Sequence, residues 1–109
     1  MSRVGFIGTP HTAPLFRPLG IDVAEVGDAG AAAAALERMC RGEHALVLLE
    51  EDVARDIAPE VERAKRRPSP VLSLVPGVGG SRGTTIQAIR KLVERAVGAD
   101  ILFKGEDVS

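Results

Sequence analysis

The sequence predicts an α/β fold: a four-stranded parallel sheet, Rossmann- or receiver-like, in the order 2-1-3-4, with a tethered C-terminal helix. Three observations predict it. Short apolar segments alternate with helix-forming segments, which is typical of a parallel sheet with right-handed crossovers. The second apolar segment has one polar face, as an edge strand does. A glycine-rich run separates the last helix from everything before it.

The four expected strands lie near residues 3–8, 21–26, 45–50 and 70–75. The segment at 3–8, RVGFIG, suits a strand buried on both faces, and ALVLL at 45–49 is the most apolar run, hence the expected central strand. Residues 21–26, IDVAEV, alternate between apolar and polar, which predicts an edge strand. We therefore expect helices to pack on both faces of a small sheet.

Residues that favour the start or the end of a helix predict the limits of the first two helices. Thr9 before Pro10 predicts an N-cap followed by proline in the first turn. Prolines 14 and 18 allow only a short or broken helix there. Asp28 is expected to cap a long helix over residues 29–41, which Gly42 ends.

The third helical segment follows the acidic trio at residues 50–52, which we expect to cap it, because negative charge is favoured at a helix N-terminus. Val53, Ile57 and Val61 recur every four residues on a helix that should reach about residue 66. Pro59 is expected to kink it or to start a new turn.

The last helix is predicted over residues 84–101, behind a glycine-rich linker at 77–83. The expected domains are thus a sheet domain at 1–76, the linker, and the helix and tail at 84–109. One interpretation is that the helix folds back onto the sheet domain; the other is that the tether presents it to a partner. The candidate partner-binding side chains are its apolar stripe and flanking basic residues: Ile86, Ile89, Arg90, Leu92, Val93, Arg95 and Val97.

Composition limits the function classes. The 109 residues are enough for one modest core. The net charge of −1 argues against a general nucleic-acid or membrane-surface binder. The single cysteine, Cys40, excludes an internal disulfide, and we expect it to be a buried structural thiol in an intracellular protein. No apolar run approaches the roughly 20 residues of a membrane helix, so no membrane insertion is expected.

Few chemical groups follow the strands, where a parallel sheet binds its ligands. The glycine-rich loop lacks the lysine of a nucleotide-binding P-loop. A receiver-type magnesium site needs carboxylates after the first strand, where this chain has Gly8 and Thr9. His11 has no second histidine or cysteine nearby to share a metal. The sequence therefore predicts no enzyme activity, cofactor or metal.

The order of these residues resembles a known family. Gly8 at the end of the first strand, Phe16-Arg17 followed by Gly20-Ile21, and the segment IRKLVERAVGADI at 89–101 are similar to the F subunit of prokaryotic V-type (A-type) ATPases. The resemblance covers nearly the whole chain and is most specific at residues 90–101. The chain departs from it at Thr9, where the family usually has aspartate, and in its two helix-breaking prolines.

This resemblance implies a noncatalytic part of a central rotor stalk, cytoplasmic and peripheral to the membrane. Its receiver-like domain carries a C-terminal helix that packs along the coiled coil of the D subunit, inside the ring of catalytic-head A and B subunits. The enzyme couples ATP hydrolysis or synthesis to the transport of an ion such as H⁺.

Two rival hypotheses remain open. The first is a degenerate receiver-like signalling module that binds partners without phosphorylation; binding of a phosphate analogue at Glu50 or Asp52 would favour it. The second is a small enzyme with an anionic substrate; a ligand-sized pocket lined by His11, Ser81 and Thr84 would favour that one.

Overall fold

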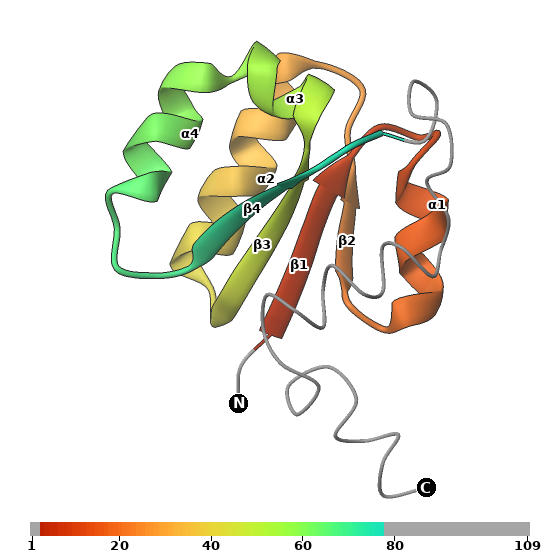
Figure 1. Ribbon diagram of the computed structural model, residues 1–109, viewed down its shortest axis with the longest axis horizontal. Coiled ribbons are helices and arrows are strands. Elements are labelled where there is room, and N and C mark those ends of the chain that lie inside the picture. Colours follow the sequence, from red (N-terminus) through yellow and green to blue (C-terminus); the bar gives the residue numbers. More distant parts are fainter. Residues whose placement is uncertain (1–2, 78–109) are drawn as a thin grey trace, which may run out of the picture.

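The computed structural model describes residues 3–77, which form a four-stranded sheet with helices on both faces (Figure 1). Each strand pair is parallel and the order is β2-β1-β3-β4, so the predicted topology is confirmed. The strands are β1 (Arg3–Gly8), β2 (Asp22–Glu25), β3 (His44–Glu50) and β4 (Val71–Val75). The helices are α1 (Ala13–Phe16), the 3-10 helix η1 (Arg17–Leu19), α2 (Ala29–Arg41), α3 (Glu51–Asp56) and α4 (Ala58–Lys65). The helix predicted at 84–101 lies outside the described residues.

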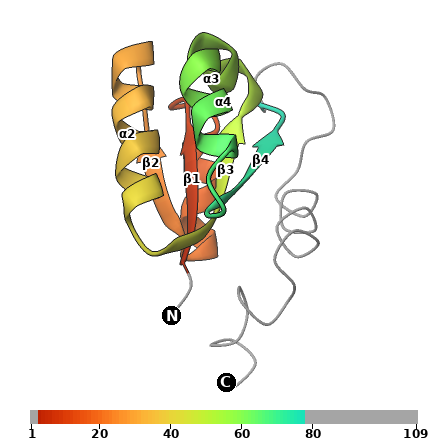
Figure 2. The same ribbon diagram turned by 90° about the vertical axis from the view of Figure 1, so that its left-hand side faces the viewer.

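Two apolar clusters fill the two sides of the sheet. Helices α2, α3 and α4 cover one face, while α1 and η1 lie against the other (Figures 1 and 2). The larger cluster joins α2, α3 and α4 to alternate residues of β1 and β3: Ile7, Leu36, Met39, Val47, Leu49, Val53, Ile57 and Val61. The smaller cluster joins α1 to the other residues of the same strands and to the end of β4: Val4, Phe6, Ala13, Phe16, Leu46, Leu48 and Val75. Because β1 and β3 are buried on both faces, they are apolar between their ends, whereas the edge strand β2 is only half-buried.

The two residues predicted to begin and end α2 lie at its ends. The Asp28 side chain accepts a hydrogen bond from the Ala31 backbone N–H at 2.7 Å, which caps the helix. At the other end, the Gly42 N–H donates to the carbonyls of Arg38 and Met39. The alanine-rich sequence between them forms a helix that lies close to the sheet.

The predicted interruption at Pro59 is also confirmed. Ile57 leaves helical geometry between α3 and α4, and Pro59 lies in the first turn of α4, where its missing N–H costs nothing. Val53, Ile57 and Val61 are all buried, so the spacing of four residues identified the core-facing side even across the break.

The predicted N-cap at Thr9 is wrong. Helix α1 begins at Ala13, and the Thr9 carbonyl accepts the N–H groups of Thr12 and Ala13 at 3.1 and 2.9 Å. The Thr9 side chain instead bonds to Glu50, 41 residues away. The Thr9 hydroxyl, which the local pattern assigns to the helix N-cap, therefore bonds to Glu50, a residue distant in the sequence.

Helix α1 is short, as its prolines predict, but it places one large ring. Phe16 stacks on Phe6 of β1 with centroids 3.8 Å apart and planes 8° from parallel. Neither ring is exposed to solvent. This stack attaches the thin α1–η1 layer to the middle of the sheet.

Candidate functional site

The predicted partner-binding residues, Ile86 to Val97, all lie outside the described residues, as do Ser81 and Thr84 of the enzyme hypothesis. Their roles therefore stay predictions, and so does the division of the chain at 77–83. Two polar clusters can be described in atomic detail, one at each end of the sheet.

At the carboxyl end of the sheet, a buried carboxylate joins the first and third strands. Glu50 ends β3 and is 3% exposed. Its Oε1 atom accepts the Thr9 backbone N–H at 2.8 Å and the Thr9 hydroxyl at 3.0 Å. Charge-assisted bonds of this kind offset the cost of burying a carboxylate. Glu50 therefore occupies the N-cap position of α3 without capping it through its side chain; Glu51 and Asp52 supply the acidic first turn of that helix, as predicted.

Two glycines surround the Glu50 side chain. A Cβ atom at Gly8 would lie 2.8 Å from Oε1 of Glu50, and one at Gly77 would collide with Oε2. A larger residue at Gly77 would displace the carboxylate, and one at Gly8 would meet the Phe6 ring as well as Glu50, so the close approach of the backbone to buried side chains accounts for both glycines. Gly77, the second residue after β4, lies next to the Glu50 side chain.

This arrangement bears on the receiver hypothesis. A receiver acts through a cluster of carboxylates beside the third strand, but here the residue after β1 is Thr9, and it bonds to the carboxylate at the end of β3. Among residues 3–77 no group of three His, Cys, Asp or Glu side chains lies close enough to hold a metal ion. His11 is exposed.

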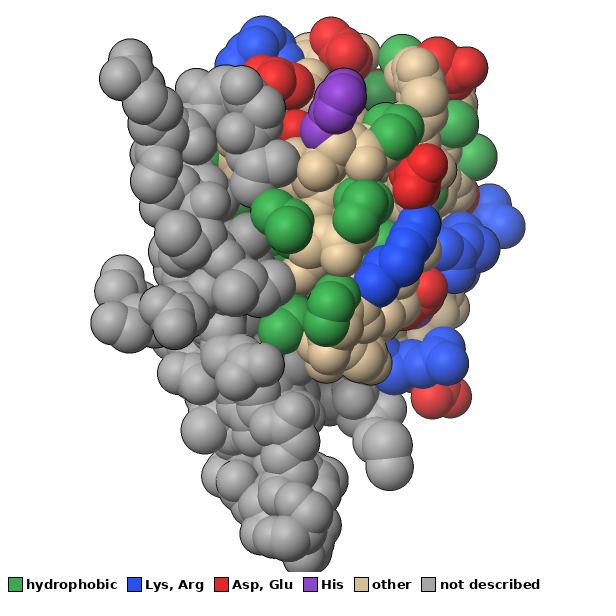
Figure 3. All heavy atoms as spheres, turned by 90° about the vertical axis from the view of Figure 1, so that its right-hand side faces the viewer, with side chains coloured by type: hydrophobic (Ala, Val, Ile, Leu, Met, Phe, Trp, Pro, Cys, Tyr) green, Lys and Arg blue, Asp and Glu red, His purple; other side chains and the backbone are tan. Residues whose placement is uncertain are grey.

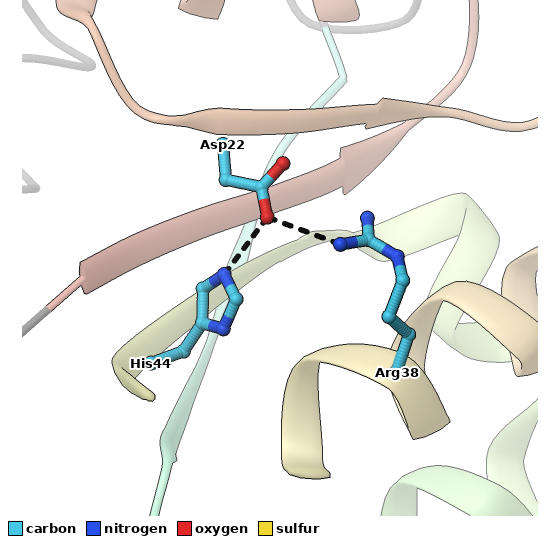
Figure 4. Close-up of polar contacts among 3 residues, drawn as sticks. All are labelled: Asp22, Arg38 and His44. Carbon is cyan, nitrogen blue, oxygen red and sulfur yellow. Dashed lines mark hydrogen bonds and ion pairs between the residues drawn. The ribbon is translucent and has the colours of Figure 1, made fainter. Parts of the chain in front are cut away.

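At the amino end of the sheet, a second cluster joins β2, β3 and α2 (Figure 4). Asp22 Oδ2 lies 2.9 Å from Nε2 of His44 and 3.2 Å from Nη1 of Arg38. Because a carboxylate only accepts, Nε2 of His44 donates in this contact. The His44 side chain is 2% exposed, and its Nδ1 has no hydrogen-bond partner within the described part of the chain.

Burial raises the pKa of Asp22, but the hydrogen bonds from His44 and Arg38 outweigh that effect and hold the pKa below its usual value. The cluster links the edge strand β2 to β3 across β1. Sequence analysis missed it; the available signal was a lone aspartate on the edge strand and a histidine at the start of a buried one.

Cys40 differs from the prediction of a buried thiol. It is half-buried, contacts the larger apolar cluster, and lines a cavity of about 80 Å³ between α2 and α4. Burial is the main reason that its pKa is raised, which keeps the thiol protonated and poorly reactive.

The described chain is thus a Rossmann-like α/β module whose first and third strands are joined at the carboxyl edge by an internal Glu50–Thr9 contact. Comparison with known proteins identifies the family: residues 4–93 match the model of the ATP synthase (F/14-kDa) subunit, and the chain belongs to this family.

Curated relatives agree along almost the full length. The chain is 31% identical over 100 residues to the F subunit of the V-type ATP synthase of Clostridium botulinum strain Eklund 17B, covering 92% of this chain and 97% of the relative. It is also 31% identical over 100 residues to the corresponding protein of Clostridium perfringens, covering 92% and 95%. The corresponding protein of Fusobacterium nucleatum is 28% identical over 102 residues, covering 94% and 97%. The predicted resemblance is therefore confirmed.

Among the helices of residues 3–77, none combines the length and apolar character that crossing a bilayer requires.

Proposed function

We propose that this protein is a noncatalytic component of the central rotor stalk of a V-type (A-type) ATPase. In this role it couples ATP hydrolysis or synthesis in the catalytic head to ion transport across the membrane. The observation that carries the proposal is the family match over residues 4–93, which includes both the sheet domain and most of the predicted C-terminal helix. The relatives are named as F subunits of a V-type ATP synthase, which identifies the complex. The place of this chain in the central stalk of that complex is our inference.

The site supports a noncatalytic role. The carboxyl edge of the sheet is where α/β proteins of this topology bind ligands. In this chain the Glu50 side chain fills part of that edge and bonds to Thr9, and the hollow beside Thr9 at the same edge has a volume of only about 60 Å³. A protein that transmits torque needs a rigid small domain and an extended contact with its neighbours, not a ligand pocket.

We assign partner binding to residues 84–101. The predicted stripe of Ile86, Ile89, Leu92, Val93 and Val97 would lie along the coiled coil of the D subunit, inside the ring of A and B subunits. Arg90 and Arg95 flank this stripe and would pair with acidic residues of the partner, adding specificity more than affinity. In such an assembly the protein is cytoplasmic and peripheral to the membrane.

Binding of the purified chain to the coiled-coil D subunit of the same complex tests the proposal. We expect a stoichiometric complex by gel filtration and calorimetry, and no ATP hydrolysis by the chain alone. Tight Mg-ATP binding to the isolated chain, or no complex with the D subunit, would contradict it. Binding of a phosphate analogue at Glu50 would instead favour the receiver-like module.

A further inference from the structure

Charged side chains are separated between the two ends of the sheet. At the carboxyl end, β2 finishes and α2 and α3 begin with acidic residues, and Arg55 is the one basic residue of α3. At the amino end, where α2 and α4 finish, basic residues predominate. Figure 3 views the β2 edge, where acidic side chains gather near the top, the carboxyl end of the sheet, and most of the basic ones lie lower. The acidic residues of the carboxyl end are Glu25, Asp28, Glu51, Asp52 and Asp56.

The basic residues at the amino end form one surface. Helices α2 and α4 lie side by side, and both finish at the end of the sheet where the strands begin (Figures 1 and 2). Arg63 and Arg67 line the same small cavity as Glu37 and Cys40 of α2, so the two helix ends adjoin. We call this region the amino-end basic surface. It consists of Arg38, Arg41, Arg63, Lys65, Arg66 and Arg67.

The helix dipole accounts for only part of this surface. Basic side chains are favoured in the last turn of a helix, and the last turns of α2 and α4 each contain two of them. That effect falls off within the last turn, yet Arg66 and Arg67 follow α4. Arg66 is exposed, and within residues 3–77 it forms no ion pair. The surface therefore carries more positive charge than the two helix ends require.

The internal ion pairs of this surface engage its cations weakly. The side-chain nitrogens of Arg63, Lys65 and Arg67 lie 3.9, 3.9 and 4.0 Å from the carboxylate oxygens with which they pair. These distances are beyond the range of a hydrogen bond. The three side chains are also 66%, 48% and 44% exposed, and exposed ion pairs contribute little to stability. Their N–H groups are therefore available to an acceptor on another molecule.

The composition of the surface indicates what it would bind. Five of its six basic residues are arginines, and a guanidinium can bind one carboxylate through two parallel hydrogen bonds. Two carboxylates, Glu37 and Glu62, lie among them. The anionic headgroups of a membrane would repel these carboxylates, whereas a folded protein can place a cation opposite each one. A protein surface that is acidic but of mixed charge is therefore the better match.

We propose that the amino-end basic surface docks an acidic surface of a partner protein. This contact is separate from the one predicted at residues 84–101. It goes beyond the proposed function, which does not require it.

The test uses labelled poly-L-glutamate as the probe and measures its binding to the full-length chain by fluorescence anisotropy at low salt. Arg63→Glu and Arg66→Glu should each weaken binding at least about fivefold. Arg55→Glu is the matched control and should leave affinity within about twofold. Like Arg63, Arg55 is exposed and pairs with an acidic residue three positions earlier, but it lies at the other end of the sheet. Circular dichroism establishes that each variant is folded; should one variant at the basic surface fail to fold, the other decides.

Several results would overturn the proposal. No binding by the wild-type chain, or wild-type affinity in both Arg63→Glu and Arg66→Glu, would do so. Equal losses in all three variants would also do so, because net charge and not this surface would then bind the probe. Raising the salt from about 0.05 M to about 0.3 M should remove the difference between Arg66→Glu and the wild type, because salt screens exposed charges; a difference that persists would contradict an electrostatic contact.

Two parallel measurements distinguish other occupants of the same surface. Tighter binding to phosphatidylglycerol vesicles than to poly-L-glutamate, with the same losses in the two variants, would indicate a membrane surface. Association of the chain with itself at low salt, measured by sedimentation velocity and lost in Arg66→Glu, would indicate that the acidic carboxyl end of a second copy binds there. Either result would overturn the proposal.

Lys65 gives a second readout in the ATPase complex of the proposed function. A carbodiimide joins a lysine amine to a carboxylate as an amide and takes up the released water as a urea. We expect Lys65 to be joined to an aspartate or glutamate of another protein chain, and Lys65→Arg to remove that product. Products with Glu62 of the same chain alone would overturn this inference. Absence of the chain from the complex would instead overturn the proposed function, and the poly-L-glutamate measurement would still decide this inference.

Discussion

Glu50 and Thr9, at the ends of adjacent strands, share two hydrogen bonds through a single carboxylate oxygen, at 2.8 and 3.0 Å. The pair joins β3 to the start of the segment that leads into α1. It also determines the local backbone, because Gly8 and Gly77 lie against the same side chain. Residues that could have formed an open ligand site thus hold three parts of the fold together.

We expect Glu50→Ala to be strongly destabilising. Each hydrogen bond to a buried carboxylate contributes about 1.5–3 kcal/mol, so losing both should lower the free energy of unfolding by about 3–6 kcal/mol. Thr9→Val removes the hydroxyl donor but keeps the N–H, and should cost about 1.5–3 kcal/mol. Urea denaturation measures both. Equal losses in the two variants would show that the backbone N–H bond contributes nothing.

The Asp22 cluster predicts a pH dependence. The folded state holds the pKa of Asp22 below its usual value, so the ionised form stabilises the fold. This contribution is fully present above the unfolded-state pKa, about 3.9, and is lost as the pH falls through the lower folded value. Between about pH 5 and pH 3, wild-type stability should therefore fall more steeply than that of Asp22→Asn. Parallel pH profiles for the two proteins would contradict the assignment.

The Phe6–Phe16 stack predicts how much the packing of α1 on the sheet contributes to the free energy of unfolding. Phe16 is fully buried in the thinner of the two apolar layers. Phe16→Ala should lower the free energy of unfolding by about 3–5 kcal/mol through lost burial and the cavity left behind. Leu15→Ala, at the half-buried neighbouring position, is the control and should cost clearly less. If the two variants have the same unfolding midpoint in guanidinium, the stack does not anchor α1.

Val93→Asp tests the predicted C-terminal contact. A charge within the apolar stripe should weaken assembly with the D subunit by several kcal/mol, because the carboxylate loses water without gaining a partner. The fold of residues 3–77 should be unaffected by this change. Affinity is measured by calorimetry, with Gln87→Asp on the opposite helical face as the matched control. Wild-type affinity in Val93→Asp would place the interface elsewhere.

A chain truncated after Pro76 completes that test. We expect it to unfold cooperatively near the wild-type temperature but to fail to join the complex. Loss of folding in this variant would mean that the C-terminal segment belongs to the core of the sheet domain, as the fold-back interpretation holds. Unchanged affinity for the D subunit would mean that the sheet domain alone carries the interface.

Much of the fold could be predicted because its signals are local. Asp28, Gly42 and Pro59 mark the helix boundaries through backbone chemistry within a few residues of themselves. The apolar runs in β1 and β3 and the alternating pattern in β2 indicated which strands are central and which is an edge, and the order 2-1-3-4 followed from them. The family was also predictable, and its model matches residues 4–93 of the chain.

The four strands, their order in the sheet, the limits of α2 and the family could be predicted from the sequence. Tertiary structure alone decided the partners of its polar side chains: Thr9 and Glu50 carry patterns of helix caps, yet they bond to each other, and Asp22 meets His44 across β1. Local patterns describe the three to four residues around a position. A contact over 22 or 41 residues depends on the register of parallel strands, which places two distant side chains within hydrogen-bonding distance only after the sheet has formed.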